Sequence, residues 1–276
     1  MKKSKFNEIF DLTNKTIVVT GSAGLLGSQY CEILSEAGAD VVLIDLDSEK
    51  NKRLENNIKR KYKTNPSSFS IDLTSKNEIL ELKDKIKKNY NKIYGLVNNA
   101  AFTAKTSKIK KIKNFSTPLE DYPLELWNKT LDINLTSVFV CSQVFGNEMA
   151  KNKSGVIVNI SSTYGLVGAD QRIYGKSKIN SPPSGAASKG AIINLTRYLA
   201  AYWHGKNIRV NTLSPGGVKD STYQNPDFIK KYSQKTILGR MAEKTEYNGA
   251  ILFLMSDASS YMTGANLVVD GGWTAW

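Results

Sequence analysis

The stretch Thr16-Ile-Val-Val-Thr-Gly-Ser-Ala-Gly-Leu-Leu-Gly27 decides the fold of this 276-residue chain. Its first five residues are mostly β-branched and predict a buried strand, and the apolar periodicity of residues 25–37 predicts a helix. The glycines between them have the spacing of a phosphate-binding turn. Gly21 allows the tight turn, Gly24 lets the backbone approach a pyrophosphate, and Gly27 permits close helix–strand packing. The helix N-terminus then presents unpaired N–H groups to an anion.

Short apolar runs alternate with longer helical patterns along the rest of the chain. Further strands are predicted at 41–45, 68–71, 93–97, 156–161, 208–213 and 266–269, and further helices at 48–62, 76–89, 124–149, 186–205 and 244–255. This alternation predicts an α/β fold, a Rossmann-type doubly wound parallel sheet of about seven strands with helices on both faces. No repeat or linker divides the chain, so we expect one domain, 1–276, with 1–11 as an N-terminal extension.

Two connections are longer than a compact α/β fold needs. The lysine-rich stretch 102–117 follows the predicted fourth strand, and 164–183 follows the fifth and ends in Pro182-Pro183. Open α/β sheets bind ligands at the carboxyl ends of their strands, and long loops there are more often functional. We therefore expect both to border an active site, with tolerated surface insertion as the alternative.

The composition excludes several classes of protein. The net charge is +13, but the lysines are dispersed and accompany no nucleic-acid recognition motif. We therefore expect a solvated basic face, or attraction of an anionic substrate, rather than a nucleic-acid partner. No run approaches the ~20 apolar residues of a membrane span, and we expect no metal site. Cys31 and Cys141 lie in apolar runs, which favours reduced thiols and a cytoplasmic location.

An acidic residue, Asp45, ends the predicted second strand in Val-Leu-Ile-Asp45. A carboxylate at this place accepts both adenosine ribose hydroxyls and repels a 2′-phosphate. Its neighbours Leu46 and Asp47 carry no positive charge, and neither does Ser22 in the glycine-rich turn. We therefore expect NAD to be preferred, with NADP as the alternative. A turn or helix-cap aspartate is the structural interpretation of the same residue.

Further motifs extend from about Leu12 to the C-terminus: Thr20-Gly…Gly27, Ile71-Asp-Leu73, Val97-Asn-Asn-Ala-Ala101, Leu213-Ser-Pro-Gly216 and Val269-Asp-Gly-Gly-Trp273. Together they resemble the short-chain dehydrogenase/reductase superfamily, in its compact branch of about 250 residues. Leu25 and Ala101 replace glycines common in that family. The resemblance implies cofactor contacts from Gly21, Ser22, Gly24, Leu25, Leu26, Gly27, Asp45, Leu46, Asp72, Leu73, Asn99, Ala100, Ala101, Lys189, Pro215, Gly216 and Val218.

An asparagine, a serine, a tyrosine and a lysine act together in this family. The resemblance assigns the asparagine that holds a water to Asn134, the serine that polarises the substrate oxygen to Ser162, and the lysine to Lys189. Positions i and i+4 of a helix lie side by side, so the lysine can bias the tyrosine's proton and hold the cofactor ribose. Four residues before Lys189, however, the chain has Gly185, which offers no hydroxyl.

A second Tyr-x-x-x-Lys, Tyr174-Gly-Lys-Ser-Lys178, begins 12 residues after Ser162. Pro182-Pro183 separates it from the predicted helix, because proline disfavours helix before it and breaks one it interrupts. Lys189 has the better spacing to the next strand, so we expect Tyr174 in a loop. Three hypotheses remain: Gly185 leaves a chain that binds NAD but turns over poorly, Tyr174 folds back to supply the phenol, or water held by Ser162 and Lys189 moves the proton.

The resemblance implies reversible hydride transfer between NAD and a secondary alcohol or ketone. The lysines of 102–117 favour an anionic substrate. Long-loop members similar to this chain act in bacterial surface-glycan pathways, which suggests a sugar or nucleotide-sugar. A 3-oxoacyl thioester is the runner-up, and a non-catalytic NAD-binding subunit is the alternative of another class. Because family members pair through the helices corresponding to 124–149 and 186–205, we expect a homodimer or homotetramer.

Overall fold

The computed structural model describes residues 5–103, 117–177 and 180–276. Its described strands form one parallel sheet in the order β3-β2-β1-β4-β5-β6-β7. They are β1 Thr16–Thr20, β2 Asp40–Ile44, β3 Ser67–Phe69, β4 Ile93–Asn98, β5 Gly155–Ile160, β6 Ile208–Pro215 and β7 Asn266–Val269. The strand order reverses between β1 and β4, the place where doubly wound sheets bind ligands. The predicted fold class is confirmed.

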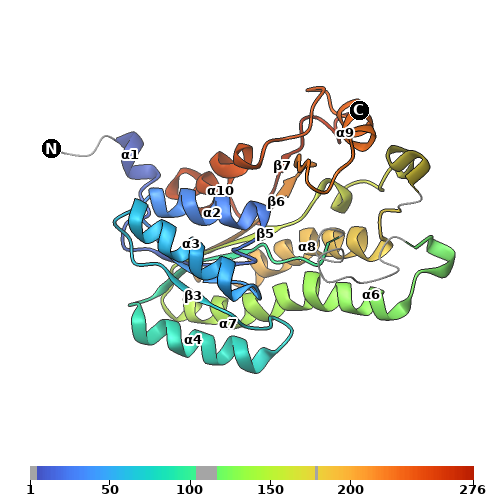
Figure 1. Ribbon diagram of the computed structural model, residues 1–276. Coiled ribbons are helices and arrows are strands. Elements are labelled where there is room, and N and C mark those ends of the chain that lie inside the picture. The colour runs from blue at the N-terminus through green and yellow to red at the C-terminus, as the bar shows by residue number, and fades with distance from the viewer. Residues whose placement is uncertain (1–4, 104–116, 178–179) are drawn as a thin grey trace.

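Helices cover both faces of the sheet (Figure 1). One layer contains α2 Leu25–Glu36, α3 Ser48–Lys61 and α10 Asn248–Met255, and the other contains α4 Lys76–Asn89, α7 Ser137–Lys151 and α8 Pro183–Tyr202. Side chains of β1 alternate between the two layers because successive residues of a strand point to opposite faces. Ile17 and Val19 join the buried cluster under α2 and α10, whereas Val18 joins the cluster under α4 and α7.

Several helix boundaries differ from the prediction. The helix predicted at 124–149 is α6 Leu124–Leu131, a π-helical turn η2 Asp132–Thr136, and α7. The helix predicted from residue 186 is α8, which begins at Pro183 because proline suits the first turn, where its missing N–H costs nothing. The remaining described helices are α1 Lys5–Ile9, α9 Pro226–Ser233 and the 3₁₀ turns η1 Leu119–Asp121, η3 Thr163–Gly165, η4 Gln171–Ser177, η5 Lys244–Tyr247 and η6 Asp257–Ser259.

The two thiols lie on opposite faces of the sheet. Cys31 on α2 and Cys141 on α7 are both free and buried, in different core clusters. Burial raises the pKa of Cys141 to about 12, so its thiol stays protonated and unreactive. Each cysteine therefore serves as a small core residue. No described helix combines the length and the apolar character that crossing a membrane requires.

Candidate active site

The glycine-rich turn at the end of β1 has no room for side chains. Gly21 has φ +64°, and a Cβ there would lie 2.8 Å from the Cα of Ala100. A Cβ on Gly27 would collide with the carbonyl oxygen of Gly21. Asn99 fixes the turn from β4, because its amide donates to the carbonyl oxygens of Thr20 and Gly21, each at 3.0 Å. The chain therefore folds this turn tightly against the switch point.

The first turn of α2 is open to an anion. Gly24 precedes it and gives no side-chain cap, whereas Asp47 caps α3 by accepting the N–H of Lys50. The unpaired N–H groups that begin α2 therefore have only solvent or a ligand to bind. Leu25 and Leu26, both predicted cofactor contacts, are the first residues of this helix. A helix end without a side-chain cap is compatible with an anion, and the pyrophosphate site that the glycine spacing indicates stays a prediction.

Asp45 lies beside that turn, one residue after β2. Its carboxylate accepts the N–H of Ala23 at 3.0 Å and the N–H of Asp47 at 3.0 Å. These bonds orient the carboxylate but leave lone pairs for ribose hydroxyls. Ser22 is completely buried and its hydroxyl donates to the side-chain oxygen of Asn51 at 2.7 Å. The Ser22 side chain therefore points into the protein, where it stabilises the turn through its hydrogen bond to Asn51.

Three other predicted cofactor contacts follow the strands β2 and β3. Leu46 is 55% exposed. The Asp72 carboxylate accepts the N–H and the hydroxyl of Thr74 at 2.9 and 2.8 Å, which closes a local turn. Leu73 packs partly against the core cluster under α4. The backbone at 72–73 is thus held in place by its own side chains and by the core.

The turn after β6 is held against the end of β7. The Gly216 N–H donates to the carbonyl oxygen of Val269 at 2.9 Å, and Tyr247 donates to the Gly216 carbonyl oxygen at 3.1 Å. A Cβ on Gly216 would lie 2.8 Å from the Cα of Asp270, so glycine is required here. The predicted nicotinamide contacts Pro215, Gly216 and Val218 therefore sit on a rigid turn.

Asn134 lies inside the π-helical turn between α6 and α7 and is 2% exposed. Its side-chain oxygen accepts the N–H of Phe102 at 2.6 Å, and its amide donates to the Phe102 carbonyl oxygen at 3.2 Å. Single π turns in helices often mark functional sites. Here the turn aims Asn134 at the segment that follows β4. Most of the predicted 102–117 loop lies outside the described residues.

The two serines after β5 have different tasks. The Ser161 hydroxyl donates to the carbonyl oxygen of Lys189 at 2.7 Å and so joins β5 to α8. Ser162 caps η3, where its side-chain oxygen accepts the N–H of Tyr164 at 3.2 Å. The Ser162 hydroxyl proton has no acceptor recorded within the described ranges. The role of Ser162 as donor to a substrate oxygen stays a prediction.

Lys189 and Gly185 both lie on α8, four residues apart, so the predicted register holds in the structure. The Lys189 amine donates to the carbonyl oxygen of Ile160 at 2.7 Å, and burial lowers its pKa to about 8. A Cβ on Gly185 would touch only the Cγ of Pro182, at 3.5 Å, which is ordinary contact. Position 185 of the helix could therefore carry a Cβ without a clash.

Tyr174 belongs to an aromatic cluster instead of joining Lys189. Its ring stacks on Phe228 of α9 with centroids 5.5 Å apart. Burial raises the pKa of its phenol, which hydrogen-bonds with Ser181 and Tyr164, and no lysine affects that pKa. Lys178, its predicted neighbour, lies outside the described residues. The structure therefore gives Tyr174 partners other than those of a catalytic phenol.

The sequence did not reveal this aromatic cluster, which includes Tyr164, two residues after Ser162. Trp273 stacks on Tyr232 at 4.3 Å and meets the edge of Tyr164 at 6.3 Å. Tyr232 also accepts the Gly217 N–H at 2.6 Å, which ties α9 to the turn after β6. A signal was present: Asn225-Pro226 is a typical helix start, and the Asn225 side chain does cap α9.

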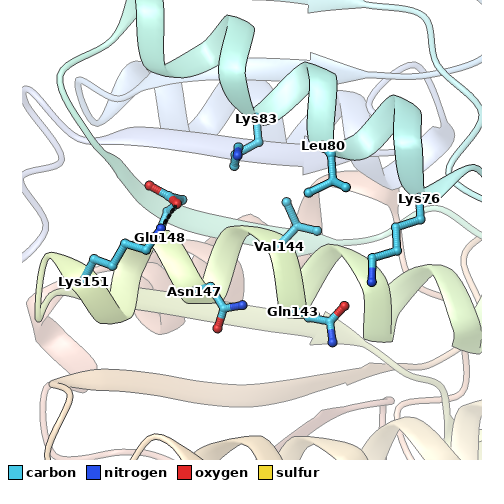
Figure 2. A pocket seen from close by; sticks show the side chains of 8 residues that line it. All are labelled: Lys76, Leu80, Lys83, Gln143, Val144, Asn147, Glu148 and Lys151. Carbon is cyan, nitrogen blue, oxygen red and sulfur yellow. Dashed lines mark hydrogen bonds and ion pairs between the residues drawn. The ribbon is translucent and has the colours of Figure 1, made fainter.

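A groove of about 420 Å³ between α4 and α7 is unrelated to this site (Figure 2). Its walls are residues on the outer faces of these two helices, including Lys76, Leu80, Gln143 and Glu148. None of them follows the carboxyl end of a strand. Among the described residues, no group of three or more His, Cys, Asp or Glu side chains is placed to hold a metal.

Comparison with known proteins agrees with this geometry. The family model described as enoyl-(acyl carrier protein) reductase matches residues 21–274. The NAD-dependent glycerol dehydrogenase of Listeria innocua serovar 6a is 34% identical over 98% of this chain and 97% of its own length. The 2-dehydro-3-deoxy-D-gluconate 5-dehydrogenase of Pseudoalteromonas atlantica is 31% identical over 96% and 98%.

A similar solved structure is that of a gluconate 5-dehydrogenase from Burkholderia cenocepacia J2315 in complex with NADP and tartrate. It superimposes with a TM-score of 0.86 at 26% identity, over 98% of this chain and 99% of that one. Together with the family match, these similarities show that the chain belongs to the short-chain dehydrogenase/reductase superfamily.

Proposed function

We propose that this member of the superfamily binds NAD in preference to NADP and transfers hydride between the nicotinamide and a secondary alcohol or ketone. The observation that carries the cofactor preference is Asp45, whose oriented carboxylate lies beside the open N-terminus of α2. A 2′-phosphate at this place would meet a negative charge. Its relatives include enzymes named for NAD and a structure with NADP, so both cofactors need testing.

The site residues divide the chemistry among them. Bound NAD(H) would supply or accept the hydride. Ser162 would donate its hydroxyl proton to the substrate oxygen, Lys189 would hold the nicotinamide ribose, and Asn134 would hold a water on the path of the proton. Gly185 stands where the family has a tyrosine, so we propose that turnover is impaired. Because Tyr174 stacks on Phe228 and hydrogen-bonds with Ser181 and Tyr164, we do not assign it the role of the missing catalytic phenol.

The proposed substrate is a polyol, a sugar acid or a related anionic sugar. Relatives named for glycerol and 2-dehydro-3-deoxy-D-gluconate support this class. The net charge of +13 favours an anionic form, and a nucleotide-sugar of a surface-glycan pathway is the more specific candidate. A 3-oxoacyl thioester is the second candidate, favoured by the description of the matching family model. The buried free thiols support a cytoplasmic location.

The test begins with titration of the chain with NADH and NADPH, followed by turnover assays on polyols, sugar acids, nucleotide-sugars and 3-oxoacyl thioesters. We expect tighter binding of NADH and slow turnover of one sugar class. Binding of NADH with no turnover on any substrate, in this chain and in Gly185→Tyr, would favour a non-catalytic NAD-binding subunit. Absence of binding to either cofactor would refute the proposal outright.

A further inference from the structure

Lys189 is a partly buried cation that donates one hydrogen bond within the described residues. Its amine donates to the Ile160 carbonyl oxygen at 2.7 Å, at the last residue of β5. Ile160 precedes Ser162 by two residues, which span at most roughly 7 Å of chain, so the amine is held within roughly 10 Å of Ser162. Water can connect the amine with a substrate oxygen held by Ser162 over such a distance. With glycine at 185, the residue one helical turn before Lys189 contributes no phenol to receive its proton.

Among the described residues, few ionisable groups lie on the segments that pack against this part of α8. They are Tyr122, Glu125, Lys129, Asp132, Tyr164 and Arg209. Glu125, Lys129 and Asp132 are exposed to water. The Arg209 guanidinium binds the carbonyl oxygens of Leu254 and Ser256. Burial alone lowers the pKa of Lys189 to about 8, without a contribution from any of these groups.

The phenols nearby are engaged elsewhere. Tyr122 and Ser184 share a hydrogen bond of 2.9 Å, on the buried side of α8. Burial raises the pKa of Tyr164, which hydrogen-bonds with Tyr174. A buried phenol with a raised pKa is a poor proton donor and a worse base at neutral pH. The Lys189 amine, which has a lowered pKa, is therefore better suited than these phenols to exchange a proton at neutral pH.

We propose that Lys189 itself exchanges the proton with the substrate oxygen in this chain and so acts as its catalytic acid and base. This role rests on the proposed function. In ketone reduction, bound NADH would supply the hydride to the carbonyl carbon. The carbonyl oxygen gains a proton from the Lys189 ammonium, the C=O bond becomes C–OH, and the neutral amine regains a proton from water. Alcohol oxidation runs the same steps in reverse.

The test compares Lys189→Arg in this chain with Lys189→Arg in Gly185→Tyr. Arginine keeps the charge but does not release its proton, so in this chain we expect a loss of at least about 10²-fold in both directions. With tyrosine restored, the phenol exchanges the proton, and the same substitution should cost only about tenfold. Tyr122→Phe, Tyr164→Phe and Tyr174→Phe should each keep the parent rate. NADH affinity and thermal unfolding, measured for every variant, show that the fold and the cofactor site persist.

The pH dependence and a titration of the free chain give independent readouts. Reduction needs the ammonium, so its rate should fall as pH rises through about 8, whereas oxidation needs the free amine and should rise through the same range. NMR titration of the ¹⁵N-labelled amine, assigned with Lys189→Met, should show the same midpoint without cofactor. Three results would each overturn this role. The first is a Lys189→Arg variant that turns over at the parent rate, and the second is a parent chain without turnover while Gly185→Tyr is active. The third is a titration midpoint of the Lys189 amine at the ordinary value for lysine. A different result would refute the proposed function: no variant, Gly185→Tyr included, binds NADH or turns over any substrate.

Discussion

At the scale of single residues, the cofactor half and the catalytic half of the site differ in completeness. Gly21, Gly27 and Gly216 each stand where a side chain would meet backbone atoms, so the geometry of the cofactor turns depends on them. Gly185 is different, because its Cβ position is free apart from Pro182. Glycine at 185 is therefore not required by the fold. Under the proposed function, glycine at this position leaves α8 without a phenol beside Lys189.

Substituting Asp45→Ala should change the choice of cofactor. Loss of charge-assisted hydrogen bonds of about 1.5–3 kcal/mol corresponds to NADH binding roughly 10- to 100-fold more weakly. NADPH affinity should rise or hold, because the negative charge near its 2′-phosphate is gone. Titration of both cofactors against the parent chain measures this. Unchanged NADH affinity would show that Asp45 only closes the turn through Ala23 and Asp47.

Substituting Gly27→Ala should damage the cofactor turn itself. The added methyl group would collide with the Gly21 carbonyl oxygen, and overpacking of this kind costs about 1–3 kcal/mol of folding stability. NADH binding should weaken by at least about tenfold as the turn shifts. Gly249→Ala is the matched control, since nothing lies within 4 Å of its Cβ position on α10. That variant should be stabilised slightly and should bind NADH as the parent does; equal behaviour of the two variants would contradict the account.

At the scale of elements, the sheet and the register of α8 were predictable from the sequence, whereas the π turn at Asn134 and the short helix α9 were not. Most strands are apolar and rich in β-branched residues, β3 Ser67–Phe69 excepted, and the spacing of Lys189 to β6 placed Gly185 on α8 correctly. The π turn at Asn134 inserts one residue into an otherwise regular apolar pattern, which periodicity does not detect. The α9 helix is short, and its burial depends on aromatic partners distant in sequence, Tyr164 and Trp273. Such tertiary contacts leave no local signal.

An ion-pair cluster joins the helices α4 and α7. The Glu148 carboxylate is 8% exposed and bonds Lys87 of α4 and Lys151 of α7, each at 2.7 Å (the latter pair is drawn in Figure 2). Burial alone would raise the pKa of Glu148, but its hydrogen bonds to Lys151 and Lys87 outweigh burial and lower it. The folded state thus favours the carboxylate more than the unfolded chain does.

Glu148→Gln should therefore destabilise the protein most at neutral pH. The contribution of Glu148 is fully present above its unfolded pKa of about 4.3 and is lost as pH falls through the lowered folded pKa. Urea unfolding from pH 7 to pH 3 should show the gap between parent and variant narrowing with acid. Glu81→Gln, at an exposed site on α4, is the control and should show little gap. A gap that stays constant with pH would exclude the charge as its cause.

At the scale of the whole molecule, the outer faces of α7 and α8 carry exposed aromatic side chains. Tyr198 and Tyr202 are 63% and 67% exposed and stack on each other with centroids 6.1 Å apart, and Phe139 on α7 is 45% exposed. Large exposed aromatic groups that stack on each other, as Tyr198 and Tyr202 do, are candidates for an interaction site. The expected homo-oligomer would cover these side chains and hold α8, with Lys189, in place.

Replacing both tyrosines, as Tyr198→Glu with Tyr202→Glu, should break that contact. Charges introduced into an apolar interface are costly to bury, so the mass from sedimentation should fall by about half. Tyr261→Glu is the control, because Tyr261 is fully exposed and does not belong to α7 or α8. A parent chain that sediments as a monomer, or a double variant with unchanged mass, would rule out this interface.

The central claim is that the chain keeps a working NAD site and lacks only a proton-donating phenol at position 185. Single-turnover hydride transfer at saturating NADH, in the parent, Gly185→Tyr and Gly185→Phe, tests it most directly. The restored tyrosine should raise the rate by about 10²–10⁴-fold, as a positioned acid does. The phenylalanine, of equal bulk without a hydroxyl, should bring no gain. Equal NADH affinity in all three with no faster transfer in Gly185→Tyr would contradict the account.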